Sequence, residues 1–186
     1  MKRFAIHDLS FGGVKLVERQ RIGDKRGFLA RIFCVDELAE AGWTDPIAQV
    51  NHTYTARRGT IRGMHFQRPP HAETKLVTCL RGEVWDVALD LRRRSPTYLD
   101  WRAEILSADN GRALLIPDGF AHGFQSLCDD VELLYCHSKA YNADAAAGAN
   151  PRDPRLAIAW PLPIAEISDS DARHPSVGAG LEGVDI

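Results

Sequence analysis

The sequence has 186 residues, 45% of them hydrophobic, and a formal net charge of -2. This length and composition favour one globular domain with its own core, and the charge excludes an overall positive field that would attract nucleic acid or a membrane surface. No apolar stretch approaches the roughly 20 residues of a bilayer-spanning helix, and the N-terminus lacks the pattern of a signal peptide. We therefore expect a cytoplasmic protein with no nucleic-acid or membrane partner.

The segment Val35–Trp43 is the best helix candidate, because Asp36 can cap it and Gly42 can end it. Most of the remaining chain predicts short strands rich in β-forming residues, with Gly, Asn or Asp between most of them. These strands are expected at residues 47–55, 75–80, 84–91, 98–106, 113–116, 120–127 and 131–137. Their close spacing, without αβ alternation, predicts an all-β sandwich or barrel with a few short peripheral helices.

Two further patterns refine this picture. Arg81-Gly82 between two predicted strands is typical of a hairpin turn. In the strand that follows, Trp85, Val87 and Leu89 share one face, which is the period of two expected of a strand. Beyond residue 151 prolines multiply, and residues 176–186 are small in composition. We expect one domain over residues 1–175 and a flexible tail over residues 176–186.

Two histidine motifs stand out, GTIRGMHFQ at residues 59–67 and GRALLIPDGFAH at residues 111–122. Together they resemble the two motifs of the cupin superfamily, a double-stranded β-helix of the jelly-roll type. Metal-binding cupins read His-x-His in the first motif, but Gln67 replaces the second histidine here. Because glutamine is a poor ligand for first-row metals compared with imidazole, we expect the barrel without a metal ion.

Longer stretches narrow the resemblance. IRGMHFQRPPH (61–71), KLVTCLRGEVWDVALDLRRRSPT (75–97), IPDGFAHGFQSL (116–127) and ELLYCHSKAY (132–141) occur in the order found in the dTDP-4-dehydrorhamnose 3,5-epimerase family, which the chain resembles over residues 26–175. The resemblance implies a cupin-like jelly roll, a homodimer, no metal or redox cofactor, and an isomerase of deoxysugar biosynthesis acting on a nucleotide sugar.

The implied chemistry explains the residue types. A ketone at C4 acidifies the hydrogens on C3 and C5, so removing one gives an enolate, and a proton returned to the opposite face inverts the centre. The reaction needs a base, a cation or donor for the enolate oxygen, and an acid across the ring.

The resemblance assigns these roles to four residues. His65 is the candidate base, because imidazole titrates near neutrality. Asp171 is the candidate partner that orients the imidazole, with Asp169 as its rival. Lys75 would stabilise the enolate oxygen, and Tyr135 would supply the acid on the opposite face.

The substrate's nucleotide end implies further residues. Arginine's planar fork suits phosphate oxygens, and Arg26 and Arg62 match positions that hold the diphosphate or sugar. An aromatic ring for the base and three polar contacts complete the predicted binding set, which comprises Arg26, Arg62, Tyr141, Gln49, Asn51 and His122.

The chain also departs from its relatives. Arg31 stands where they typically carry a glutamate, and Val50 where an aspartate is frequent. Ser170 likewise replaces a frequent lysine, and Ala145 or Ala146 replaces an acidic residue. Because these positions are expected near the nucleotide or its sugar, one hypothesis is a specialised deoxysugar pathway in which the base differs from thymine and the sugar from the rhamnose precursor. The base, the sugar, and the choice of C3, C5 or both remain open.

Two alternatives to the epimerase stay open. In a metal-dependent cupin oxygenase or isomerase, His65, Glu73 and His122 would share an ion, with His71 as a further ligand. In a non-catalytic sugar-binding cupin, the same pocket would bind a sugar without proton exchange.

Overall fold

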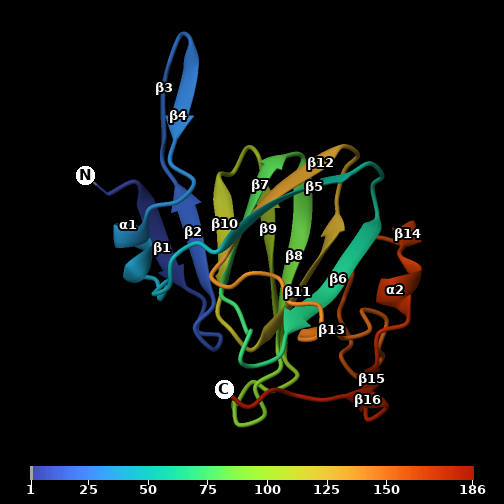
Figure 1. The fold of residues 1–186 in the computed structure, drawn as a ribbon. Coiled ribbons are helices and arrows are strands. Elements are labelled where there is room, and N and C mark those ends of the chain that lie inside the picture. Colours follow the sequence, from blue (N-terminus) through green and yellow to red (C-terminus); the bar gives the residue numbers. More distant parts are fainter. Residues whose placement is uncertain (1) are drawn as a thin grey trace.

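The computed structural model describes residues 2–186, which form two main sheets and short flanking elements (Figure 1). The first sheet has the order β1-β2-β10-β7-β12-β5, and the second β13-β6-β11-β8-β9. From β5 onwards the chain passes repeatedly between them. The strands of the first sheet are β1 (Phe4–Asp8), β2 (Lys15–Arg19), β5 (Gln49–Thr55), β7 (Lys75–Arg81), β10 (Arg112–Ile116) and β12 (Val131–His137). Those of the second are β6 (Thr60–Gln67), β8 (Glu83–Asp90), β9 (Trp101–Ser107), β11 (Phe120–Ser126) and β13 (Ala146–Gly148).

The predicted all-β fold is confirmed, and its hydrophobic core lies between the two sheets. Inward-facing side chains of both sheets form one buried cluster, in which Val77 and Leu133 of the first sheet meet Val84, Leu106 and Phe124 of the second. Alternate residues of a strand point to opposite faces, so each strand contributes every second side chain to this cluster. The cavity described below opens between the same two sheets.

The predicted hairpin between residues 75–80 and 84–91 is wrong. β7 pairs with β10 and β12, whereas β8 pairs with β9 and β11, so Gly82 lies where the chain crosses from one sheet to the other. A turn sequence fixes the local bend, but it does not fix which strands pair. The alternation within β8 is confirmed, because Val87 and Leu89 share the outer face with Trp85.

The C-terminal part of the chain covers that outer face. Leu156, Leu181 and Val184 are buried there in one cluster with Val87 and Leu89. Within residues 176–186 the structure has β15 (Ser176–Val177) and β16 (Gly180–Leu181). These contacts show that part of the predicted tail packs on the barrel, while its flexibility stays a prediction.

The helices are short. α1 spans Val35–Ala39 and ends earlier than predicted, with Cys34 at its N-cap and Asp36 in its first turn. α2 (Asp169–Ala172) follows β14 (Glu166–Ile167), which adds to β6 in parallel. Among residues 2–186 neither helix has the length and apolar character needed to cross a membrane.

One hairpin projects away from both sheets at the top of Figure 1. It consists of β3 (Arg21–Asp24) and β4 (Gly27–Ala30), which pair with each other and with no other strand among the described residues. Phe28 and Leu29 on this hairpin are exposed large hydrophobic side chains. These two strands were not predicted from the sequence.

Candidate active site

An irregularity in β6 brings two candidate site residues onto one face. Arg62 and His65 are three positions apart, so a regular strand would point them to opposite faces. The pairing of β6 with β11 shifts by one residue between His122 and Phe124, which gives β6 an extra residue and leaves both side chains exposed on the same side. Gly63 permits this, because a Cβ there would lie 2.5 Å from the Cα of Gly123.

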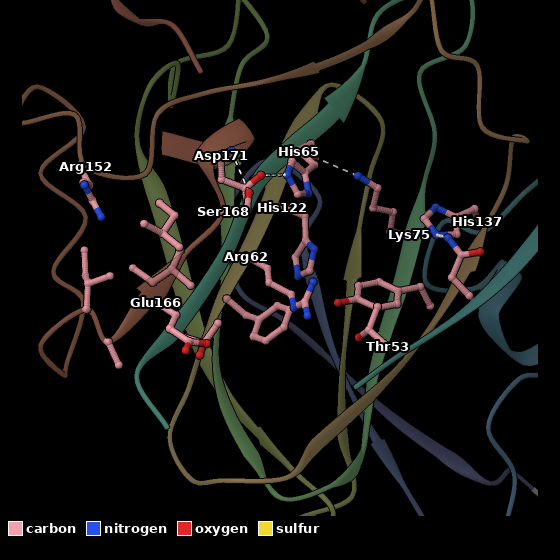
Figure 2. A pocket seen from close by; sticks show the side chains of 18 residues that line it. Thr53, Arg62, His65, Lys75, His122, His137, Arg152, Glu166, Ser168 and Asp171 are labelled. Atoms are coloured by element: carbon pink, nitrogen blue, oxygen red, sulfur yellow. Dashed lines mark hydrogen bonds and ion pairs between the residues drawn. The ribbon is translucent and has the colours of Figure 1, made fainter. Parts of the chain in front are cut away.

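His65 forms a hydrogen bond with Asp171, its predicted partner. The distance from His65 Nε2 to Asp171 Oδ1 is 2.8 Å, and the other carboxylate oxygen accepts the N–H of Gly63 at 3.1 Å (Figure 2). Ser168 caps the short helix α2 by accepting the N–H of Asp171 at 3.0 Å, which holds the aspartate in place. The rival, Asp169, is exposed.

These contacts set the charge of the carboxyl group. Burial would raise the pKa of Asp171, but hydrogen bonds from His65 and from the N–H of Gly63, with the charge of His65, hold the pKa below its ordinary value. An ionised Asp171 accepts the Nε2–H of His65, which leaves Nδ1 of the ring with its lone pair. Half of the His65 side chain is exposed, and it lines both of the cavities described below.

Lys75 lies beside the histidine with its ammonium group buried. Nζ is 2.9 Å from Glu73 Oε1 and donates to the backbone carbonyl of His65 at 3.0 Å. An ammonium group has three donors, so one remains for a ligand. Gln67, which replaces the metal-ligating histidine of other cupins, donates to the same Glu73 at 3.1 Å.

Tyr135 and His122 form the inner wall of the same region. Their rings pack edge to face with centroids 5.7 Å apart. Burial raises the pKa of Tyr135, so its phenol holds a proton throughout the physiological range. His122 Nε2 lies 2.8 Å from Asp86 Oδ1, and both of these side chains are buried.

Two adjoining cavities hold these side chains. The larger has a volume of about 810 Å³ and the other about 510 Å³, and both are lined by His65, Lys75, Asn51 and His137. Figure 2 shows Asp171, His65 and Lys75 in a row, joined by dashed lines, with His122 and Arg62 beside them. Of the predicted site residues, the larger cavity collects Asn51, Arg62, His65, Lys75, His122, Tyr135 and Asp171.

The smaller cavity collects the outer residues of the prediction. Gln49 and Tyr141 line it with Asn51. Gln49 donates to Asn51 at 3.0 Å and accepts the backbone N–H of Tyr141 at 2.9 Å, while the Tyr141 side chain stays exposed. A planar ring beside amide groups is suited to an aromatic ligand.

Arg26 is the predicted site residue that the structure does not bring to either cavity. It lies on the projecting hairpin, paired with Asp24 at 2.6 Å and largely exposed. Arg31 pairs with Glu37 of α1 and Val50 is exposed, and neither of these substituted positions lines the two cavities.

Three residues at or beside the site were missed by the sequence reasoning. Asp86, His137 and His174 lie against His122, Tyr135 and His65, respectively. Burial, with the charges of Lys75 and His122, lowers the pKa of His137 to about 4. His137 follows Tyr135 by two positions on β12. Because residues two apart on a strand point to the same face, the position of Tyr135 could have predicted that His137 also faces the site.

Among the described residues, one group of three potential metal ligands converges. It consists of His65, Asp171 and His174, with one ligand atom from each lying within 4.8 Å of the others. The set expected for a metal-dependent cupin is arranged differently, because Glu73 pairs with Lys75 and His122 with Asp86.

Comparisons with known proteins agree with this geometry. The family model described as dTDP-4-dehydrorhamnose 3,5-epimerase matches residues 8–178. A 3,5-epimerase of that description from Sinorhizobium fredii is 38% identical over 174 residues, covering 91% of this chain and 87% of the relative. A dTDP-4-dehydrorhamnose 3-epimerase from Streptomyces niveus is 38% identical over 170 residues, covering 90% and 82%. The crystal structure of a dTDP-6-deoxy-D-glucose-3,5-epimerase from Legionella pneumophila, in complex with dTDP-4-keto-L-rhamnose, matches with a TM-score of 0.90 at 35% identity, covering 96% and 95%. This likeness confirms the predicted cupin-like barrel.

Proposed function

Because the chain belongs to the dTDP-4-dehydrorhamnose 3,5-epimerase family and is an isomerase of that type, we propose that it inverts C3, C5 or both in a dTDP-linked 4-keto-6-deoxyhexose. The observation that carries this proposal is the hydrogen-bonded pair of His65 and Asp171 at a cavity lined by Lys75 and Tyr135. The proposed reaction uses side chains of this chain and proton exchange with solvent, and it needs no cofactor.

His65 is the base of the proposed reaction. Its Nδ1 removes the proton from the carbon beside the ketone, and the electron pair of the C–H bond moves into the enolate. The positive charge that forms on the imidazole is stabilised by the ionised Asp171 at 2.8 Å. Proton transfer of this kind contributes roughly 10²–10⁴ to the rate.

Lys75 stabilises the enolate oxygen with its remaining N–H donor. Because Glu73 and the carbonyl of His65 fix the ammonium group before substrate arrives, little reorganisation accompanies the reaction, and a preorganised donor contributes about 3–4 kcal/mol. Tyr135 then gives its phenolic proton to the carbon from the opposite face, and the ketone re-forms. Solvent returns a proton to the phenolate and takes one from His65, so the proton balance closes.

The nucleotide half of the substrate occupies the smaller cavity. Tyr141 stacks on the base, Gln49 and Asn51 bind its polar edges or the ribose, and Arg62 binds the diphosphate. Four lining residues shared by the two cavities support one extended ligand. Of the substituted positions, Arg31 and Val50 line neither cavity, whereas Ser170 lines the smaller one. Because the matched relatives are described as epimerases of dTDP-linked sugars, we propose dTDP as the carrier.

A homodimer completes the site in this proposal. The projecting hairpin exposes Phe28 and Leu29 beside Arg26, and apolar side chains on a free hairpin favour pairing with another subunit. Arg26 would then bind the diphosphate in the site of the partner subunit. We also propose that the enzyme works in the cytoplasm, where sugar nucleotides are made and consumed.

Proton NMR in deuterated water tests the proposal. With dTDP-4-keto-6-deoxyglucose, the enzyme is expected to exchange the proton at C3, C5 or both for deuterium and to release an inverted product. Tyr135→Phe is expected to keep exchange while losing most inversion. A protein that binds the substrate with no exchange at either carbon would be the non-catalytic sugar-binding cupin instead. Titration with dTDP, CDP, GDP and UDP tests the base, and preference for any but dTDP would overturn that assignment.

A further inference from the structure

His174 lies directly behind the proposed base and has no part in the reaction described above. It follows α2, three residues after Asp171, and its ring packs edge to face on His65 with centroids 5.6 Å apart. The ring fills the space above Gly148, where a Cβ would lie 2.3 Å from Nε2 of His174. The imidazole of His174 is therefore packed between Gly148 and His65.

The Nε2 atom of His174 is buried without a hydrogen-bond partner among the described residues. It lies 3.7 Å from Asp171 Oδ1, which is too far for a hydrogen bond but close enough for both atoms to bind one ion. A buried polar atom without a partner is rare in folded proteins and calls for an explanation. A ligand shared with Asp171 provides one.

The three side chains together match the requirements of a zinc ion. Two imidazoles and one carboxylate are a common zinc ligand set, and tetrahedral bonds of about 2.0–2.1 Å place ligand atoms roughly 3.3 Å apart. Here the oxygen of Asp171 is 2.8 Å from the nitrogen of His65 and 3.7 Å from that of His174. Small side-chain movements bring both distances to this value, and the exposed side of His65 leaves the fourth position to water.

We propose that His65, Asp171 and His174 form an inhibitory zinc site in which the metal ion disables the base of the epimerase. On binding, Zn²⁺ replaces the hydrogen on Nε2 of His65, which leaves to solvent as a proton. The bound dication opposes a second positive charge on the same ring, so Nδ1 no longer accepts the substrate proton. The binding rests on geometry alone, whereas the inhibition also rests on the proposed function of His65.

Titration calorimetry with zinc chloride on the chelator-treated protein tests the binding. The wild-type protein is expected to bind one zinc ion per chain, and His174→Ala to bind it at least tenfold more weakly. His52→Ala is the matched control, because His52 is an exposed histidine outside the group, paired with Glu132, and it should bind as the wild type does. Equal affinity in the wild type and His174→Ala, or no binding by the wild type, would overturn the site. His174→Gln and near-ultraviolet circular dichroism show whether a loss reflects misfolding.

Activity measurements with and without zinc test the inhibition separately from the proposed function. Without zinc, the deuterium exchange of His174→Ala at the sugar carbons is measured first and sets that variant's own baseline. With zinc at a concentration that stops the wild type, the variant should remain active. A wild-type enzyme that binds zinc at this site and keeps full exchange overturns the inhibition. Absence of exchange in zinc-free protein would count against the proposed function and leave the calorimetric result standing.

Discussion

The molecule contains two histidine–aspartate pairs with the same contact and opposite surroundings. In each, Nε2 of the histidine lies 2.8 Å from Oδ1 of the aspartate. The His65 side chain is 51% exposed, whereas that of His122 is 6% exposed and its partner Asp86 is fully buried. The hydrogen bond alone therefore does not identify a base. Access of the free ring nitrogen to a ligand distinguishes the two, and the following changes test that distinction.

Replacing the exposed histidine should have the largest effect on turnover. His65→Asn removes the base and is expected to lower kcat by about 10³-fold, while the free energy of unfolding changes by about 0.5 kcal/mol or less because the ring is half exposed. Steady-state kinetics and urea unfolding measure the two. A variant with nearly normal turnover would move the base elsewhere, with His122 as the first residue to test.

Replacing the partner of that base should have the next largest effect. In Asp171→Asn the amide can present its N–H to the ring, which favours the wrong tautomer of His65 and removes the charge that stabilises the imidazolium. We expect kcat to fall about 10²-fold or more. Asp169→Asn, at the exposed rival position, is the control and should be neutral. Equal losses in both variants would contradict the assignment of Asp171.

A change in the buried pair of His122 and Asp86 should lower the free energy of unfolding. His122→Asn removes the partner of a carboxylate that is out of contact with solvent, which is expected to cost about 1–3 kcal/mol in the free energy of unfolding. Urea unfolding of His122→Asn and of His65→Asn compares the two pairs directly. If His65→Asn were the more destabilising change, the contrast drawn from their burial would be wrong.

His137 should act through a pH dependence of stability, an effect no larger than that of His122→Asn. Its pKa of about 4 in the folded protein lies below the ordinary value of 6.5, so between these values the unfolded chain binds a proton that the folded protein does not. Stability therefore rises with pH across this window and falls on acidification. His137→Gln should reduce the loss between pH 7 and pH 4.5 by about 1–3 kcal/mol, measured by urea unfolding. An unchanged slope would show that this imidazole titrates normally.

The sequence predicted seven of the strands and the residues of two motifs because both depend on local patterns. The alternation in β8 marks a strand whatever it pairs with, and His65, Lys75 and Tyr135 lie in recognisable stretches. β6 was not predicted, although it carries the base, because its extra residue interrupts the period of two around Gly63. The pairing of β7 with β10 and β12 was not predictable from a turn sequence.

Contacts between segments that are distant in the sequence could not be predicted either. Asp86 and His174 contribute through the packing of one strand or turn on another, so neither has a local signal. Arg26 was predicted to bind the substrate, but a motif does not reveal that its hairpin projects away from the two main sheets and that its side chain lines neither cavity. Whether a second subunit receives it depends on assembly, which one chain's pattern does not encode.

The separation of His65 and Asp171 by 106 residues determines when, during its synthesis, the chain can become active. At ribosomal speeds of about 5–20 residues per second, the base emerges roughly 5–20 seconds before its partner. Until α2 has been made, the imidazole of His65 has no partner to orient it, so a chain that stops short of α2 has no competent base. Catalytic competence is thus acquired near the end of translation, and prematurely terminated chains are expected to be inactive.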